Sequence, residues 1–275
     1  ATDALTPVSA TPRLDAELLM AHALGIDRSA MLLRMHDLAV PAGFAAMLAR
    51  RVADEPVAYI TGMQAFWDLN LHVTPDVLIP RADSETVIEV AMAAFAGRGA
   101  PARILDLGTG SGALLLAALS VFSGAEGVGI DASAAALAVA SGNAARLGLD
   151  GRATFERRDW TLDMWADGLG QFDLILCNPP YIEDATPLAD MVARHEPHSA
   201  LFAGPDGLRD YRILLKTLEK LLKTTGIAVF EIGFNQSKSV AKLGTEAGFT
   251  SELTHDLSGN PRVLRFSLGI AQPNR

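Results

Sequence analysis

The chain has little of what stabilises or exports a secreted protein. It contains one cysteine, Cys177, among 275 residues, which excludes an internal disulfide and is typical of a reducing compartment. Its first residues, Ala1–Ala4, lack the basic and apolar regions of a secretory signal. No apolar run is long enough to cross a bilayer. We therefore expect a cytoplasmic protein with no membrane partner.

Positive charge is also scarce. The chain carries 23 Lys and Arg against 32 Asp and Glu, which gives a net charge of −9. General binding to nucleic acid depends on basic side chains that neutralise phosphates, so we expect no direct nucleic-acid partner. The hydrophobic content of 49%, with 20% charged residues, is typical of a globular chain.

Three regions of different periodicity follow one another. Residues 1–62 have helical spacing without strand alternation, and Thr11-Pro12 is a typical helix start. Residues 63–83 predict a β-hairpin that links two domains. In this hairpin, residues 67–73 alternate between apolar and polar side chains, residues 74–76 form the turn, and residues 77–79 form the return strand.

Residues 84–275 alternate between strand and helix signals. We expect helices at 112–121, 133–148, 208–223 and 236–247, and strands at 103–107, 128–131, 153–158, 172–177, 227–232, 251–255 and 262–268. This order predicts an α/β fold with a doubly wound, mainly parallel, Rossmann-like sheet, preceded by a small helical domain.

The most informative motif is Asn178-Pro179-Pro180-Tyr181. It follows the apolar run 172–177, so we place it at the carboxyl end of a buried strand, where open α/β sheets bind their ligands. Two prolines have no backbone N–H and cannot continue the sheet. They leave a rigid segment with free carbonyl oxygens between an amide and an aromatic ring. Such a segment indicates a site for a planar amide or amino group.

A glycine-rich loop follows the first strand of this region. The loop and the acidic residue that ends the next strand comprise Asp106, Gly108, Thr109, Gly110, Ser111, Gly112 and Asp131. Glycines permit close backbone approach to a ligand, the following helix offers free N–H groups, and Asp131 can accept hydrogen bonds from ribose hydroxyls. A nucleoside-containing cofactor is indicated. The glycine spacing alone fits both a nicotinamide dinucleotide and S-adenosylmethionine.

Acidic and aromatic neighbours bear on this choice. Asp106 favours S-adenosylmethionine, because its negative charge suits a sulfonium or ammonium group and opposes a pyrophosphate; alternatively, it only orders the loop. Asp159 and Trp160 end the third strand, beside the expected adenine site. Asp159 could accept from the adenine amino group, and Trp160 could pack against the ring or belong to the core.

Together these segments closely resemble the release-factor glutamine N5-methyltransferases, a family of S-adenosylmethionine-dependent enzymes with an N-terminal helical domain. The resemblance covers about residue 50 to the end and is weaker before it. The Asn-Pro-Pro-Tyr motif alone is shared with adenine and cytosine amino methyltransferases. The additional matching segments make it more specific: residues 55–62, 66–67, 78–81 with Glu85, 196–197, 200–201, 204–208, 231–233 with Gln236, and Asp256 with 262–263.

The resemblance implies a substrate and a role for each motif. The substrate would be the glutamine of the Gly-Gly-Gln motif in class 1 peptide chain release factors, which residues 1–62 would help to dock. Gly108 to Gly112 would hold the methionine part of the cofactor, Asp131 its ribose, and Trp160 its adenine side. Asn178 would contact both cofactor and substrate. The glutamine pocket would be completed by Pro179, Pro180 and Tyr181.

The expected chemistry depends on positioning. Asn178 Oδ1 and the Pro179 carbonyl could each accept one N–H of the glutamine amide and favour charge on its nitrogen, while Tyr181 packs against the amide face. We expect no catalytic histidine and no metal, because the nitrogen becomes acidic as it is methylated.

Several alternatives stay open. The motifs also fit an adenine-N6 or cytosine-N4 nucleic-acid methyltransferase, a glutamine methyltransferase of a ribosomal protein, a nicotinamide-dependent oxidoreductase, and a non-catalytic binding module. Arg81 either steadies the cofactor end of the cleft or pairs with Glu85. Glu231 either reaches the active site or makes a structural hydrogen bond.

Overall fold

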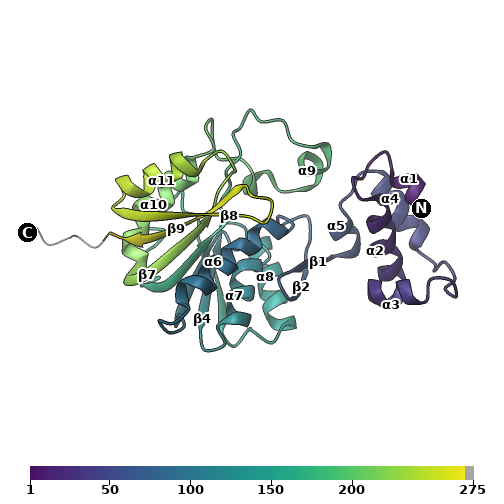
Figure 1. The fold of residues 1–275 in the computed structure, drawn as a ribbon, viewed down its shortest axis with the longest axis horizontal. Coiled ribbons are helices and arrows are strands. Elements are labelled where there is room, and N and C mark those ends of the chain that lie inside the picture. The colour runs from purple at the N-terminus through teal and green to yellow at the C-terminus, as the bar shows by residue number, and fades with distance from the viewer. Residues whose placement is uncertain (270–275) are drawn as a thin grey trace, which may run out of the picture.

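The computed structural model describes residues 1–269. Figure 1 shows a central sheet with helices on both faces, and a group of N-terminal helices joined to it by a short hairpin. The N-terminal helices are α1 (Thr2–Leu5), α2 (Pro12–Leu24), α3 (Arg28–Leu33), α4 (Phe44–Val52) and α5 (Val57–Thr61). The remaining helical elements are η1 (Ala82–Ser84), α6 (Glu85–Phe95), α7 (Ala113–Val121), α8 (Ala134–Arg146), α9 (Asp190–His195), η2 (His198–Ala200), α10 (Arg209–Leu221) and α11 (Ser237–Glu246).

The central sheet has seven strands in the order β5-β4-β3-β6-β7-β9-β8. They are β3 (Arg103–Leu107), β4 (Glu126–Asp131), β5 (Ala153–Arg157), β6 (Phe172–Cys177), β7 (Leu222–Glu231), β8 (Phe249–His255) and β9 (Pro261–Leu268). Strands β3 to β7 pair in parallel, and β9 runs antiparallel to both β7 and β8. The strand order reverses between β3 and β6, and this is where a doubly wound sheet opens a crevice for ligands.

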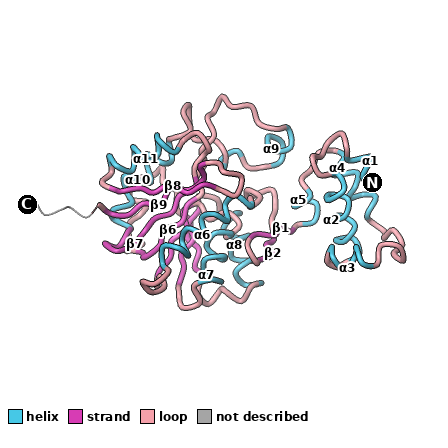
Figure 2. Tube along the Cα trace, viewed as in Figure 1, coloured by secondary structure: helices cyan, strands magenta, loops and turns pink. Residues whose placement is uncertain are grey.

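Alternate residues of the central strands enter two separate cores. Ile104, Leu174 and Val229 belong to the core that includes α6 and α7. Their neighbours Leu105 and Ile175 belong to the core that includes α10 and α11. Successive side chains of a strand point to opposite faces, so strands without polar alternation are buried on both sides. Figure 2 shows the helices on the two sides of these strands.

The predicted α/β region agrees with the structure, whose strand and helix positions differ from the expected ones by a few residues at their ends. The expected mainly parallel, doubly wound sheet is confirmed. Helix α6 was not anticipated. It packs its apolar face, including Val87 and Ile88, into the core on the α7 side of the sheet.

The hairpin lies earlier than predicted. Its strands are β1 (Met63–Phe66) and β2 (Leu69–His72), and the chain reverses at Trp67, whose φ is 57°. The strand expected at 67–73 is present over 69–72 as β2, whereas the return strand expected at 77–79 is wrong, because β2 pairs with β1 instead. Val77 and Ile79 are buried in a loop instead, 1% and 6% exposed. Alternating apolar residues indicate only that alternate side chains are buried. The strand β2 and the buried loop around Val77 and Ile79 both have such alternation.

The N-terminal helices are held together by a buried ion pair. Arg51 of α4 donates to Asp15 of α2 at 2.8 Å and to the carbonyl of Val8 at 2.8 Å, and its side chain is only 4% exposed. Such a pair fixes how the two helices pack, because removing one partner leaves a buried charge. No helix within residues 1–269 has the length and apolar character needed to span a membrane.

Two helical glycines give a matched test of packing. A Cβ at Gly244 in α11 would overlap the ring of Phe266, whereas a Cβ at Gly142 in α8 would meet nothing within 4 Å. We expect Gly244→Ala to lower the free energy of unfolding by about 1–3 kcal/mol through overpacking. Gly142→Ala should raise it by about 0.5–1 kcal/mol through helix propensity. Urea denaturation measures both, and equal effects would contradict this packing.

Candidate active site

The loop after β3 is anchored to β4. The N–H groups of Gly108 and Thr109 both donate to the carbonyl of Ile130 at 2.9 Å. Gly108 has a positive φ of 74°, and a Cβ there would lie 3.0 Å from the ring of Trp160. The glycine thus lets the indole approach the loop directly. Gly112 starts α7, and a Cβ there would lie 3.0 Å from Leu116, so it serves close packing of the loop on the helix.

Asp131 ties the ends of β3 and β4 together. Its Oδ2 accepts from Gly110 N at 3.0 Å, and its Oδ1 accepts from Ser133 N at 2.9 Å. Burial raises the pKa of Asp131, and these N–H groups oppose that rise. Each carboxylate oxygen has a further lone pair. The residue can therefore accept additional hydrogen bonds from a ligand.

Asp106 is a buried carboxyl with an unused oxygen. It is 1% exposed, and Thr109 Oγ1 donates to its Oδ2 at 2.6 Å. Within residues 1–269, its Oδ1 has no hydrogen-bond partner. Burial raises the pKa of Asp106 to about 7, repulsion from Asp131 adds to the rise, and hydrogen bonding from Thr109 opposes it. A bound cation would compensate this unpaired oxygen.

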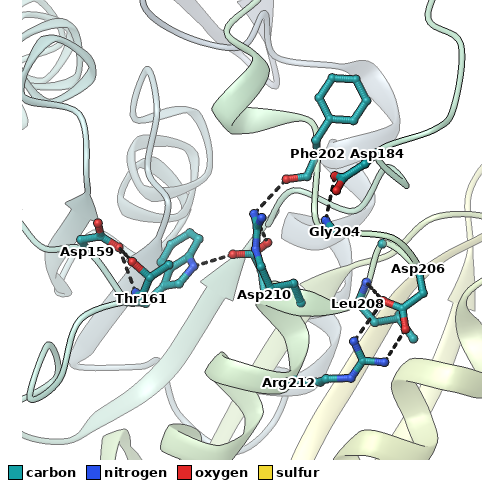
Figure 3. Close-up of polar contacts among 12 residues, drawn as sticks. Asp159, Thr161, Asp184, Phe202, Gly204, Asp206, Leu208, Asp210 and Arg212 are labelled. Atoms are coloured by element: carbon teal, nitrogen blue, oxygen red, sulfur yellow. Dashed lines mark hydrogen bonds and ion pairs between the residues drawn. The ribbon is translucent and has the colours of Figure 1, made fainter.

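Trp160 is held by a buried acid on another element. Its indole N–H donates to Asp210 in the first turn of α10 at 2.7 Å, and Arg209 donates to the other oxygen of Asp210 at 3.0 Å. Figure 3 shows the Asp159 carboxylate turned towards Thr161, from whose N–H and hydroxyl Oδ1 accepts at 2.9 and 2.6 Å. Asp159 thus orders its own loop with one oxygen and keeps the other free.

Two cavities meet at Asn178. The larger has a volume of about 340 Å³, and its lining includes Gly108, Gly110, Asp131, Ser133, Asp159, Trp160, Asn178 and Pro180. The smaller has a volume of about 210 Å³, and its lining includes Leu78, Arg81, Asn178, Tyr181, Leu201 and Glu231. A third space of about 60 Å³ adjoins them and brings Asp106, Thr109 and Ser111 close to Ser84 and Asn178. Most residues predicted for the cofactor thus line the larger cavity or the third space, and Tyr181 lines the smaller cavity. Pro180, predicted for the substrate, lines the larger cavity instead, and Pro179 is not in the lining of any of the three.

Strand register explains this meeting point. Cys177, the last residue of β6, pairs with Leu107 of β3 and with Phe230 of β7. The next residue, Asn178, therefore lies at the same edge as the loop after β3 and as Glu231 at the end of β7. Pro179 and Pro180 follow it and are buried.

Tyr181 is fixed by two residues, Glu231 and Gln236. Its hydroxyl donates to Glu231 Oε1 at 3.4 Å, and its carbonyl accepts from Gln236 Nε2 at 2.9 Å. Gln236 also donates to the carbonyl of Gly207 at 3.2 Å and accepts from Gly233 N at 3.1 Å. One amide side chain thus links the proline motif to the loops that follow β7 and precede α10.

Arg81 pairs with Glu196 and not with Glu85, so of the two roles considered for Arg81 the pairing with Glu85 is wrong. The side chain of Glu196 is fully buried and also accepts from Ile79 N at 3.3 Å. Glu85 instead accepts from Trp67 N at 2.8 Å and braces the hairpin. Glu85 is closer to Arg81 in the sequence, but the fold brings the carboxylate of Glu196 to the Arg81 guanidinium.

Glu231 combines both roles considered for it. It is 2% exposed and lines the smaller cavity, while its main-chain carbonyl accepts from the Tyr211 hydroxyl at 2.8 Å. Burial raises the pKa of the Glu231 carboxyl to about 7, and the Ser84 hydroxyl, Arg262 and Tyr181 oppose the rise. Its Oε2 has no hydrogen-bond partner among the described residues.

Sequence reasoning missed several polar residues of this site: Ser84, Glu196, Asp210 and Gln236. Glu196 and Gln236 belonged to matching segments but were given no role, and Ser84 and Asp210 were not singled out. The sequence could have indicated them only as polar residues close to the loops predicted to form the site. Their contacts are long-range, as with Asn178 Nδ2, which donates to Ser84 Oγ at 3.2 Å. Among residues 1–269, no group of three or more acidic, histidine or cysteine side chains is arranged to hold a metal ion.

Because the carboxyl of Asp106 is buried, we predict that it lowers the free energy of unfolding by an amount that depends on pH. The pKa of Asp106 is about 7 in the folded protein, against an ordinary value of 3.8 for an unperturbed aspartate. The free energy of unfolding should therefore fall as the pH rises from about 4 to 7, and this contribution should stay constant at higher pH. Asp106→Asn stays neutral and should stabilise the ligand-free protein, by about 2 kcal/mol more at pH 8.5 than at pH 5.5. Urea denaturation at both pH values measures this. The exposed Asp163→Asn is the control, and a gain that does not depend on pH would contradict the assignment.

Known proteins resemble this chain over nearly its whole length. Residues 1–62 match the PrmC N-terminal domain family, and residues 100–252 match a methyltransferase domain family. A release factor glutamine methyltransferase from Rhodospirillum rubrum is 44% identical and aligns over 92% of this chain and 78% of its own length. Relatives of the same name from Caulobacter vibrioides and Cereibacter sphaeroides are 40% and 39% identical. Those alignments cover 95% and 98% of this chain, and 90% and 99% of the relatives.

Solved structures agree on the fold. A methyltransferase from Pyrococcus furiosus has a TM-score of 0.53 at 17% identity, and the match covers 82% of this chain and all of that chain. The structural match by itself supports only the doubly wound architecture. The identity and coverage of the sequence relatives go further, and they show that the chain belongs to the release factor glutamine methyltransferase family.

Proposed function

We propose that this protein methylates the side-chain amide nitrogen of glutamine in the Gly-Gly-Gln motif of class 1 peptide chain release factors. The observation that carries the proposal is the position of Asn178 between two cavities, one lined by the glycine-rich loop and one by Tyr181. A residue in this position can contact a cofactor and a substrate at once. The names of the relatives supply the identity of the substrate.

The larger cavity has the chemistry expected of an S-adenosylmethionine site. Asp131 offers acceptors to ribose hydroxyls, and Trp160 forms an aromatic wall. In the adjoining small space, Asp106 offers an unpaired buried oxygen to a positive group. A pyrophosphate would be repelled by Asp106, which argues against a dinucleotide. When bound, S-adenosylmethionine supplies a methyl group carried on a positively charged sulfur.

The protein's own residues make the amide nitrogen of glutamine reactive. This nitrogen is a poor nucleophile because its lone pair is delocalised into the carbonyl. Asn178 Oδ1 and the Pro179 carbonyl would each accept one of its N–H groups, and fixed acceptors stabilise the positive charge that develops during attack. Tyr181, held by Glu231 and Gln236, would pack on the flat amide face. Positioning then accounts for most of the rate enhancement.

Asn178→Ala tests this mechanism. Loss of one pre-placed acceptor should lower kcat for release-factor methylation by about 100-fold or more, while the fold is retained because Asn178 is only partly buried. Transfer of labelled methyl from S-adenosylmethionine to a purified release factor measures kcat. Asn70→Ala, on the exposed face of β2, is the control.

Two further outcomes would contradict the proposal. A release factor with Gln→Ala in its Gly-Gly-Gln motif must accept no label, and label on that protein would move the site elsewhere. Label found only in nucleic acid would favour an adenine or cytosine amino methyltransferase instead. We place the reaction in the cytoplasm, in keeping with a single buried, reduced cysteine.

We infer that residues 1–62 form a docking domain for the release factor, linked through 63–83 to the catalytic residues from 84 onwards. The support is a mainly apolar groove of about 400 Å³, whose lining includes Met20, Met31, Met35, Leu38 and Phe44, with Arg13 and Glu17 also in its wall. Methionine side chains adapt to apolar partners of different shape. Leu33 and Val40, from the same helical region of the chain, are 88% and 71% exposed. Such exposed apolar surface is typical of a protein-binding site.

A charge introduced into this groove should separate docking from chemistry. We expect Met35→Glu to raise KM for a complete release factor about 10-fold, because a carboxylate would have to be buried in the complex. The kcat for a short Gly-Gly-Gln peptide should stay unchanged. Met92→Glu, on an exposed site of α6 that is 40% accessible, is the matched control. A KM that rises equally with peptide and protein would contradict the docking role.

A further inference from the structure

Asn143 is a buried amide that makes three hydrogen bonds to main-chain groups. It lies in α8 and is 1% exposed. Its Oδ1 accepts from His72 N at 2.7 Å, and its Nδ2 donates to the carbonyls of His72 and Ser111, each at 2.9 Å. A carbonyl can only accept, so these partners fix which end of the amide faces which residue. The side chain is therefore held in a single orientation.

The two bonds to His72 hold the base of the hairpin. His72 is the last residue of β2 and pairs with Met63, the first residue of β1. The next residue, Val73, donates its N–H to the carbonyl of Gly62 at 3.0 Å. Asn143 exchanges both hydrogen bonds with His72, as a residue on a neighbouring strand would do. It thus attaches α8 at the point where the N-terminal helices join the hairpin, and Figure 1 shows α8 beside β2.

The third bond of Asn143 reaches the glycine-rich loop. Ser111 is 3% exposed and lines the small space whose wall also includes Asp106 and Gly110. Phe66, the last residue of β1, lines the same space. The hairpin and the cofactor loop therefore share one wall, and Asn143 is hydrogen-bonded to both of them.

We propose that Asn143 is a positioning residue that holds the hairpin against the cofactor loop, and so aligns a docked substrate with the methyl donor. The docking role of residues 1–62 and the identity of the cofactor in this inference rest on the proposed function. The contact itself is a property of Asn143, His72 and Ser111, and it can be measured in the free protein.

Burial makes this contact difficult to replace. If Asn143 moved away, the N–H of His72 and the carbonyls of His72 and Ser111 would each lose a partner, and water has little access to the amide. The hairpin and the loop should therefore keep a fixed distance. Residues 1–62 and the pocket at Asn178 then act as two linked binding sites for one substrate. Linked sites bind tightly only when the distance between them suits that substrate.

Hydrogen exchange of the His72 amide measures the contact without any ligand. Asn143→Asp keeps the size of the side chain and its acceptor, but it loses both N–H donors and turns a carboxylate oxygen towards two carbonyls. We expect exchange at His72 to accelerate about tenfold more than exchange at Ile232, whose N–H donates to the carbonyl of Arg262 far from the hairpin. Equal acceleration at both residues would show a general loss of stability and would overturn the proposal.

Cofactor binding gives a second test, which the wild-type protein can supply by itself. Among the described residues, His72 lines none of the three cavities around Asn178, so a bound cofactor would act on it through Asn143. S-adenosylmethionine at ten times its Kd should slow exchange at His72 about tenfold. In Asn143→Asp it should slow exchange at Gly110, which lines the cofactor site, but not at His72. Slowing at Gly110 alone in the wild-type protein would overturn the proposal.

Steady-state kinetics tests the alignment of the substrate. At saturating S-adenosylmethionine, Asn143→Asp should raise KM for a complete release factor about tenfold, because the two linked sites lose their fixed distance. For a short Gly-Gly-Gln peptide, which does not use the docking domain, kcat/KM should stay within about twofold. Asn70→Ala, on the exposed face of β2, is the control and should change neither value.

The kinetic outcomes separate this inference from the proposed function. Equal losses with the release factor and the peptide would indicate a general structural role of Asn143 and would overturn the proposal. Absence of any methyl transfer by the wild-type protein would overturn the proposed function instead. The exchange rates of His72 and Ile232 in the ligand-free proteins would still decide whether Asn143 holds the hairpin.

Discussion

Parallel pairing of β6 with both β3 and β7 is the constraint on which the site depends. Leu107, Cys177 and Phe230 lie in register across these strands, so the chain segments that follow them emerge at one edge of the sheet. Parallel strands cannot be joined by tight turns and need long crossovers. Residues far apart in the chain are thereby brought together, and this edge gathers Asp106, Asn178 and Glu231.

The site concentrates polar groups that are costly to bury. Asp106 and Glu231 each keep a carboxyl oxygen without a partner among the described residues, and burial raises the pKa of both to about 7. An unpaired buried polar atom costs free energy that a packing role alone would not require. In the proposed mechanism, Asp106 recovers part of this cost when a cation binds, and Glu231 holds the hydroxyl of Tyr181 beside the proposed glutamine pocket.

Polar contacts between residues far apart in the sequence hold the loops around the proposed substrate pocket. The ion pair of Arg81 with Glu196 and the three hydrogen bonds of Gln236 join loops from five parts of the chain. Each contact fixes a main-chain segment that carries a pocket residue. A preorganised pocket of this kind suits a reaction in which alignment, and not acid–base chemistry, limits the rate.

The sequence by itself determined the alternating strands and helices, the doubly wound sheet, and the loops that hold the proposed site. These are local features: apolar runs, glycines beside acidic residues, and prolines that end a strand. Only the tertiary structure decided the partner of Arg81, the position of the hairpin turn at Trp67, and the contact of Asn178 with Ser84. The physical reason is that a side chain pairs with whatever the fold brings near it. The pattern of apolar and polar residues along the chain indicates which residues are buried. It does not indicate how close two residues lie in space when they are far apart in the sequence.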